Sequence, residues 1–334
     1  MNILIVRLGA LGDIVHAVPA AAALRRAFPD ARIDWLVDAK HSPMIDLITA
    51  VNHAVVLQHA SITGWIDVSR RMRSVGYDVA IDFQGLMKSA VLARASGAPR
   101  VAGFSIWHLR EKTARPFYSD IARPGNGLAA PWEHVIHKNL ALLGVLGVHD
   151  SRVSFPLAEV ESRALMEVRA ALGDAAFALI NPGAAWPNKR WPPERFGEIA
   201  AFLQEVRGLP SVVLWGAGEE GLAGAVVETS GGAARVAPPT NLADLLALSR
   251  AAALMVSGDT GPLHIACAAG TPSVSLFGPT DPHRNGPWLE ADVTVARYGA
   301  CGCHYERRCR KPEWCLGSVG VAEVTAAIQQ RFQR

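Results

Sequence analysis

Asp259 and Thr260 are polar residues placed between two apolar segments. Residues 251–256 form an apolar run that predicts a buried strand, and apolar residues with helical spacing follow from Pro262 onward. A helix that starts at the carboxyl end of a strand presents free N–H groups and the positive end of its dipole, which together can seat a phosphate. Asp and Thr are also ordinary N-cap residues, so this segment by itself leaves both interpretations open.

Two further polar clusters follow expected strands. Asp13 comes directly after the glycine-bearing turn 7–12, at the strand-to-helix junction where α/β sheets place ligands, although an N-cap is its ordinary interpretation. Gln84 and Lys88 follow a strand expected at 78–82. The helix dipole disfavours a cation in the first turn, so Lys88 is either a solvated side chain or a functional one.

A basic and aromatic region follows at 104–123. It contains Trp107, Arg110, Lys112, Arg115, Phe117, Tyr118 and Arg123. Charged residues in loops are usually only solvated. Arginines interleaved with aromatic residues would also suit the phosphates and carboxylates of an anionic glycolipid.

The glycines Gly216, Gly218 and Gly221 formally match the dinucleotide-binding pattern G-x-G-x-x-G after an expected strand at 211–215. This match favours a rival hypothesis, an NAD-dependent oxidoreductase. The acidic residue expected about 20 positions later at a strand end is absent, which weakens that hypothesis.

Four of the five cysteines crowd into one short segment, namely Cys301, Cys303, Cys309 and Cys315. In a cytosolic protein such a cluster indicates a metal site or free thiols more often than disulfides. The spacing lacks a standard C-x2-C pair, so structural zinc or iron is a hypothesis only. Cys267 lies in an apolar helical stretch and is most simply a small core residue.

Apolar runs predict strands at 2–6, 32–37, 54–57, 78–82, 177–181, 211–215, 251–256 and 273–277, and apolar residues with helical spacing predict one helix from Ile14 to about residue 28. The alternation of strands with helical stretches along most of the chain predicts α/β architecture with parallel, doubly wound sheets. The region 97–130 interrupts this rhythm. The length of 334 residues suits two domains. We expect them at 1–155 and 156–334, with the last helix, 321–332, as a candidate to pack back on the first domain.

Composition narrows the function classes. Half of the residues are hydrophobic, and no apolar run reaches the roughly 18–20 residues of a membrane span. The start of the chain, MNILIVRLGALGD, does not resemble a signal peptide, which predicts a cytoplasmic protein. The net charge of +3 is too small to indicate a nucleic-acid partner. Residues 1–155 hold 17 Lys+Arg against 12 Asp+Glu (+5), and residues 156–334 hold 16 against 18 (−2), so the first half would suit an anionic partner or surface.

The amino-acid sequences of five segments resemble those of family 9 glycosyltransferases, the heptosyltransferases of lipopolysaccharide core assembly. The segments are G-A-L-G-D-I-V-H-A-V-P-A, D-x-Q-G-L-x-K-S-A, E-K-T-A-R-P-F-Y, K-x-W-P, and D-T-G-P-L-H-I-A-C-A-A-G-T-P followed by F-G-P-T-D-P. The resemblance implies a GT-B fold, in which two Rossmann-like domains face each other across a cleft. It also implies an inverting, metal-independent transfer of heptose from ADP-heptose to Kdo-lipid A or the inner core at the inner face of the cytoplasmic membrane. The second and third segments look closer to the members that add the first heptose to Kdo.

The resemblance also implies roles for individual residues. Asp13 would be the catalytic base, and Lys189 would neutralise the departing diphosphate in place of a divalent metal, for which no D-x-D motif is present. The acceptor would be bound by His16, Gln84, Lys88, Arg110, Lys112 and Arg115. The nucleotide sugar would be bound by Asn181, Trp215, Glu219, Glu220, Asp259, Thr260, Gly261 and His264. The four clustered cysteines would form a local structural clip. A non-catalytic nucleotide-sugar binding protein is the second alternative.

Overall fold

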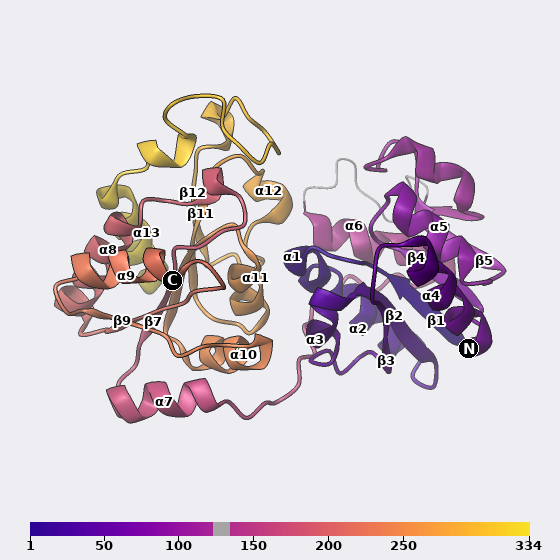
Figure 1. Cartoon of the computed structure of the whole chain (residues 1–334), viewed down its shortest axis with the longest axis horizontal. Helices are drawn as coiled ribbons and strands as arrows, with labels where there is room; N and C mark the ends of the chain where they lie inside the picture. Colours follow the sequence, from indigo (N-terminus) through magenta and orange to yellow (C-terminus); the bar gives the residue numbers. More distant parts are fainter. Residues whose placement is uncertain (123–133) are drawn as a thin grey trace. The chain divides into compact units, whose positions relative to one another are not determined.

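The computed structural model describes residues 1–122 and 134–334, drawn in Figure 1. The chain divides into two compact units, Met1–Ala158 (unit 1) and Glu159–Arg334 (unit 2), and the division falls shortly after the boundary expected from the sequence. Within the described residues, no helix is both long and apolar enough to span a membrane.

Unit 1 contains a six-stranded parallel sheet with the order β3-β2-β1-β4-β5-β6. This is the strand order of a Rossmann fold, whose topological switch point lies between β1 and β4. The strands are β1 (Asn2–Val6), β2 (Arg32–Asp38), β3 (His53–Leu57), β4 (Val79–Asp82), β5 (Arg100–Phe104) and β6 (Asp120–Ala122). The two central strands are apolar and almost completely buried, as expected for a parallel sheet covered on both faces.

Helices connect these strands, as Figure 1 shows in indigo to magenta colours. They are α1 (Leu11–Val15), α2 (Val18–Ala27), α3 (Ser42–Ile45), α4 (Ile62–Val75), α5 (Met87–Ala95) and α6 (Val135–Leu142). Short 3-10 turns occur at η1 (Ala39–His41), η2 (Lys112–Phe117) and η3 (Leu143–Leu146). The sequence predicts one continuous first helix, whereas the structure breaks it into α1 and α2 around His16.

Unit 2 repeats the architecture with a second six-stranded parallel sheet, ordered β12-β11-β10-β7-β8-β9. Its switch point lies between β7 and β10. The strands are β7 (Ala178–Asn181), β8 (Ser211–Val213), β9 (Ala234–Val236), β10 (Leu254–Gly258), β11 (Ser273–Phe277) and β12 (Val293–Ala296). The expected α/β fold with two Rossmann-like, doubly wound units is therefore confirmed.

The helices of unit 2 are α7 (Arg163–Leu172), α8 (Pro193–Arg207), α9 (Glu220–Thr229), α10 (Leu242–Ala251), α11 (Gly261–Ala268), α12 (Pro282–Asn285) and α13 (Val321–Gln333). Short 3-10 turns are η4 (Pro187–Lys189), η5 (Tyr298–Ala300) and η6 (Cys315–Ser318). The final helix packs inside unit 2, because Val324 and Ile328 belong to the core that also contains Trp191 and Phe196.

Candidate functional site

Asp259 lies at the carboxyl end of β10, beside the switch point of the second sheet, and its residue is 6% exposed. Its Oδ2 is 2.5 Å from the Lys189 Nζ and accepts a hydrogen bond of 2.6 Å from the Thr280 hydroxyl. Its Oδ1 is 3.0 Å from the His264 Nε2. The carboxylate therefore joins the loop after β7, the first turn of α11 and the loop after β11.

Burial and hydrogen bonding act in opposite directions on Asp259. Burial alone raises the pKa of this carboxyl, but the hydrogen bond from His264 and the positive charge of Lys189 together hold its pKa well below the usual range. The carboxylate is therefore ionised at neutral pH and fixes the position of the Lys189 ammonium.

Thr260 is the N-cap residue of α11, as expected, but its side chain does not cap the helix. Instead, its hydroxyl lies 3.0 Å from the Asn181 Nδ2 and 3.2 Å from the Ser257 hydroxyl. The first turn of α11 consequently starts without a side-chain acceptor for its N–H groups. This eight-residue helix has the features of an anion seat at its N-terminus, next to the Lys189 ammonium.

The backbone at Gly258 allows the Lys189 loop to approach this closely. A Cβ atom at Gly258 would lie 2.8 Å from the Lys189 carbonyl oxygen, a distance that no larger residue could accommodate. The Lys189 Nζ also lies 4.6 Å from the centre of the Trp186 ring, a cation–π contact.

Glu219 and Glu220 are both candidates to bind the nucleotide sugar, and they occupy different environments. Glu219 is half-buried: its carboxylate accepts a hydrogen bond from the Gly216 N–H and would collide with a Cβ atom at Gly183. Glu220 is exposed in the first turn of α9. The Trp215 indole N–H donates to the Ala237 carbonyl oxygen at 2.8 Å. Glu219 thus lies against the loop after β7, at Gly183.

In unit 1, Asp13 lies in the first turn of α1. This helix follows the loop after β1, at the switch point of the first sheet. Its Oδ2 is 2.5 Å from the Arg7 Nη2, and Arg7 also donates to the Phe83 carbonyl oxygen at 2.6 Å. The Asp13 side chain keeps 26% of its surface exposed. It can therefore contact a ligand, while Arg7 ties it to the loop after β4.

Gln84 joins the same two loops, since its side-chain oxygen accepts a hydrogen bond of 2.8 Å from the Leu8 N–H. Beneath it, Asp82 is completely buried and accepts hydrogen bonds from the hydroxyls of Tyr118 and Ser89 at 2.7 and 2.8 Å. Burial raises the pKa of Asp82, and these donors oppose that shift. These hydrogen bonds fix the loop that follows β4.

The remaining acceptor-side candidates are spread over several elements. His16 is buried and meets the His134 ring edge-on at 5.5 Å. The Lys88 Nζ lies 3.8 Å from Asp38, with both side chains about one-third exposed. Exposed Arg110 and Lys112 and half-buried Arg115 line the segment around η2. Arg123 lies outside the described residues.

The four clustered cysteines lie together in unit 2, with the sulfurs of Cys303 and Cys309 3.2 Å apart. Hydrogen bonding by the Arg310 N–H and by Cys309 lowers the pKa of the Cys303 thiol. Throughout residues 1–122 and 134–334, no group of three or more His, Cys, Asp or Glu side chains is arranged to hold a metal ion. Structural zinc or iron at the four cysteines stays a hypothesis from the sequence. Cys267 is buried, as expected for a core residue.

Three site residues were not found by sequence reasoning: Arg7, Thr280 and Asn188. Arg7 stands in the turn that was itself recognised, and Thr280 belongs to the segment F-G-P-T-D-P. Asn188 precedes Lys189 and donates to the Glu306 carbonyl oxygen at 2.9 Å. The available indication for each of them was its position within a recognised segment or beside one of its residues.

Two parallel sheets of Rossmann order, each with polar residues at its switch point, give a two-unit α/β protein with the architecture of the GT-B fold. The model of glycosyltransferase family 9 (heptosyltransferase) matches residues 65–315. The chain therefore belongs to this family and is a glycosyltransferase, which argues against the oxidoreductase and the non-catalytic binding protein.

Similar proteins agree with this membership. The chain is 29% identical over 324 residues to lipopolysaccharide heptosyltransferase 1 of Pseudomonas aeruginosa, covering 92% of this chain and 87% of the relative. A glycosyl transferase family 9 structure from Veillonella parvula has a TM-score of 0.80 at 24% identity and covers 100% of this chain and 97% of that one. E. coli heptosyltransferase WaaC with ADP has a TM-score of 0.77 at 22% identity and covers 100% and 98%.

Proposed function

We propose that this chain transfers heptose from ADP-heptose to the Kdo of a lipopolysaccharide inner-core acceptor with inversion at the anomeric carbon. The observation that carries the proposal is the cluster of Lys189, Asp259 and the N-terminus of α11 at the switch point of the second sheet. Family membership, the name of the Pseudomonas relative and the ADP in the E. coli structure support an ADP-linked heptose donor and a lipopolysaccharide acceptor. The choice of Kdo within that acceptor follows from the sequence resemblance.

The diphosphate of the donor would lie at the N-terminus of α11. As the bond from the anomeric carbon to the diphosphate oxygen breaks, negative charge develops on that oxygen. Lys189 is positioned by Asp259 and needs no reorganisation to stabilise this charge, so its contribution is electrostatic. Half-buried Glu219 is the better candidate of the two glutamates for the ribose hydroxyls, because it lies against Gly183 at the end of β7.

Asp13 would remove the proton from the acceptor hydroxyl, whose oxygen then attacks the anomeric carbon. The Arg7 guanidinium forms an ion pair with the Asp13 carboxylate and fixes the direction of the base. In this proposal the anionic acceptor is bound by Gln84, whose side-chain oxygen accepts from the Leu8 N–H, together with His16, Lys88, Arg110, Lys112 and Arg115.

The test measures ADP release from ADP-heptose with and without Kdo-lipid A, in EDTA, for wild type, Asp13→Asn and Lys189→Met. We expect acceptor-dependent release that persists in EDTA. Asp13→Asn should lower kcat by about 10²–10⁴ with donor binding intact, the usual range for a general base. Lys189→Met should lower kcat/KM by about 10²–10³.

Asp30→Asn is the matched control, since Asp30 is an exposed carboxylate of unit 1 at the end of α2. It should turn over like wild type. Full activity of Asp13→Asn would remove the base assignment, and release that requires a divalent cation would remove the metal-independent mechanism. Transfer from another nucleotide sugar in preference to ADP-heptose would redirect the donor assignment.

A further inference from the structure

Helix α4 leaves an apolar face of unit 1 exposed. Ile62 is 81% exposed and Ile66 is 45% exposed, whereas Val68 and Met72 are buried and attach the helix to the unit. Residues four positions apart lie on the same side of a helix, so the two isoleucines form one exposed stripe. Large aliphatic side chains grouped in this way indicate a contact surface.

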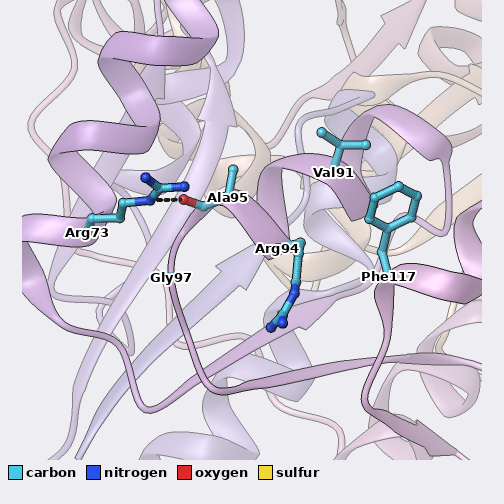
Figure 2. Close-up of a pocket in the computed structure, with 6 residues that line it drawn as sticks. All are labelled: Arg73, Val91, Arg94, Ala95, Gly97 and Phe117. Atoms are coloured by element: carbon cyan, nitrogen blue, oxygen red, sulfur yellow. Dashed lines mark hydrogen bonds between the residues drawn. The ribbon is translucent and has the colours of Figure 1, made fainter.

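One hollow includes this stripe, and a second hollow shares Arg73 with the first. The first, of about 370 Å³, is lined by Ile62, Trp65, Ile66, Ser69, Arg70 and Arg73. The second, of about 480 Å³, is shown in Figure 2 and is lined by Arg73, Val91, Arg94, Ala95, Gly97 and Phe117. Arg73 borders both hollows, so they form one continuous surface from α4 to α5 and η2.

The surface is cationic as well as apolar. Helix α4 contributes Arg70 and Arg73 against the single acidic residue Asp67, and Arg94 adds a further positive charge from α5. The ion pair between Arg70 and Asp67 is long, at 3.8 Å, and both side chains are largely exposed, so it neutralises little of this charge. In Figure 2 the Arg73 Nε donates to the Ala95 carbonyl oxygen (3.0 Å), and Arg94 extends between the Arg73 and Phe117 sides of the hollow.

We propose that this α4–α5 surface, made of the two hollows and the isoleucine stripe, docks the enzyme on an anionic membrane. Isoleucine and tryptophan beside arginine are the composition of a helix that lies in the plane of the lipid–water interface. Helix α4 has 14 residues, too few to cross a bilayer but enough to lie along one. The arginines complement the negative lipid headgroups, and the isoleucines enter the acyl boundary.

The inference rests on the proposed function in one respect: a lipid-anchored acceptor requires the enzyme to work at that surface. Docking would raise the local concentration of a vesicle-borne acceptor without contributing to the chemical step. Variants of this surface should therefore impair turnover of an acceptor embedded in a vesicle and leave turnover of a water-soluble, deacylated acceptor unchanged.

The experiment measures co-sedimentation of the full chain with vesicles of phosphatidylethanolamine and phosphatidylglycerol, against vesicles of phosphatidylcholine alone. Two double variants are compared with wild type: Arg70→Gln with Arg94→Gln, and Ile62→Ser with Ile66→Ser. We expect wild type to bind the anionic vesicles and to dissociate as salt is raised. Each arginine should account for about a fivefold change in the partition coefficient, which corresponds to about 1 kcal/mol per basic residue near an anionic surface.

The isoleucine variant should lower partitioning by at least about tenfold, because two aliphatic side chains no longer leave water. The matched control is Met166→Ser with Val206→Ser, two exposed apolar residues on helices of unit 2 that are 65% and 49% exposed. The control should bind as wild type does. All of these substitutions change exposed side chains, so thermal unfolding should confirm that each variant is folded.

Several results would overturn the proposal: no wild-type binding to anionic vesicles, unchanged binding of both double variants, or an equal loss in the unit 2 control. A lipid-free dimer that the isoleucine variant converts to monomer would assign the surface to a second copy of the chain instead. Failure of the proposed function is distinguishable, because it would abolish turnover of the soluble acceptor in every protein while vesicle binding still followed the surface variants.

Discussion

At the scale of single residues, Asp259 connects three segments that are distant in the sequence. Its Oδ2 contacts Lys189 and Thr280, and its Oδ1 contacts His264. The pair with Lys189 is largely buried, with side-chain exposures of 15% for Lys189 and 5% for Asp259. Removing one member of such a pair leaves the other charge without compensation, which costs more than the pair itself contributes.

We predict that Asp259→Asn lowers the free energy of unfolding by about 3 kcal/mol at pH 7. The pKa of Asp259 is lower in the folded than in the unfolded state, so its contribution is present above the unfolded pKa, about 3.9, and is lost as the pH falls through that value toward the folded pKa. Wild-type stability should therefore fall more steeply than that of the variant between pH 5 and pH 3. The difference in slope should approach about 1.4 kcal/mol per pH unit at the lower end.

Urea unfolding at a series of pH values measures these slopes. Asp174→Asn serves as control, because Asp174 is an exposed carboxylate before β7. Its curve should run parallel to that of wild type. An Asp259→Asn curve that is also parallel to wild type would show that this carboxylate is not stabilised in its ionised form.

At the scale of elements, the segment that carries the cysteines braces both loops of the unit 2 site. The Glu306 carbonyl oxygen accepts from Asn188, and the Trp314 indole N–H donates to the Arg190 carbonyl oxygen at 2.8 Å. The Tyr305 N–H donates to the Pro279 carbonyl oxygen at 2.9 Å. Lys189 and Thr280, which contact Asp259, thus lie in loops held by the same segment.

Asn188→Ala removes one of these braces without touching the Lys189 side chain. We predict that the KM for ADP-heptose rises about five- to tenfold, the equivalent of one hydrogen bond, while kcat changes much less. Steady-state kinetics measure the two parameters separately. Arg307→Ala, an exposed change in the same segment, should leave both at wild-type values. A large fall in kcat with unchanged KM would argue that Asn188 acts in the chemical step instead.

Strands with a continuous apolar run could be predicted from the sequence, and strands that are very short or contain polar residues or glycine could not. The central strands β1, β4, β7 and β10 were all expected, because strands buried on both faces are apolar throughout. Four outer strands were missed. β5 (RVAGF) contains arginine and glycine, β6 and β9 have only three residues each, and β12 alternates Val and Thr at half-buried positions.

The site could be predicted where its residues follow the central strands, since the strand order of a Rossmann sheet brings those loops together. Asp13 and Gln84 meet through Arg7 and Leu8, and Asn181 and Asp259 meet around Thr260. Contacts that depend on the folded course of a long loop could not be predicted. The support of Asn188 by Glu306 is an example, because 118 residues separate the two.

At the scale of the whole molecule, the chain contains two sheets of the same order, each with its own switch-point site. The candidate donor residues all belong to Glu159–Arg334, and the candidate base and acceptor residues all belong to Met1–Ala158. ADP is the nucleotide part of the donor and contains no part of the acceptor. We therefore expect it to bind to residues of unit 2. Ligands stabilise the structure that binds them by mass action, so the stabilisation reports where ADP binds.

We predict that ADP at about 100 times its Kd raises the free energy of unfolding of unit 2 by about 2.7 kcal/mol. Differential scanning calorimetry should show this as an upward shift of the unfolding transition that contains unit 2. Asp13→Asn should keep the full shift, because Asp13 belongs to unit 1 and its proposed role is toward the acceptor. Lys189→Met should lose most of it, because the charge that compensates the diphosphate is gone. An equal shift in Lys189→Met would show that ADP binds away from Lys189. Loss of the shift in Asp13→Asn would show that Asp13 of unit 1 contributes to binding ADP, contrary to the proposed division of roles between the two sheets.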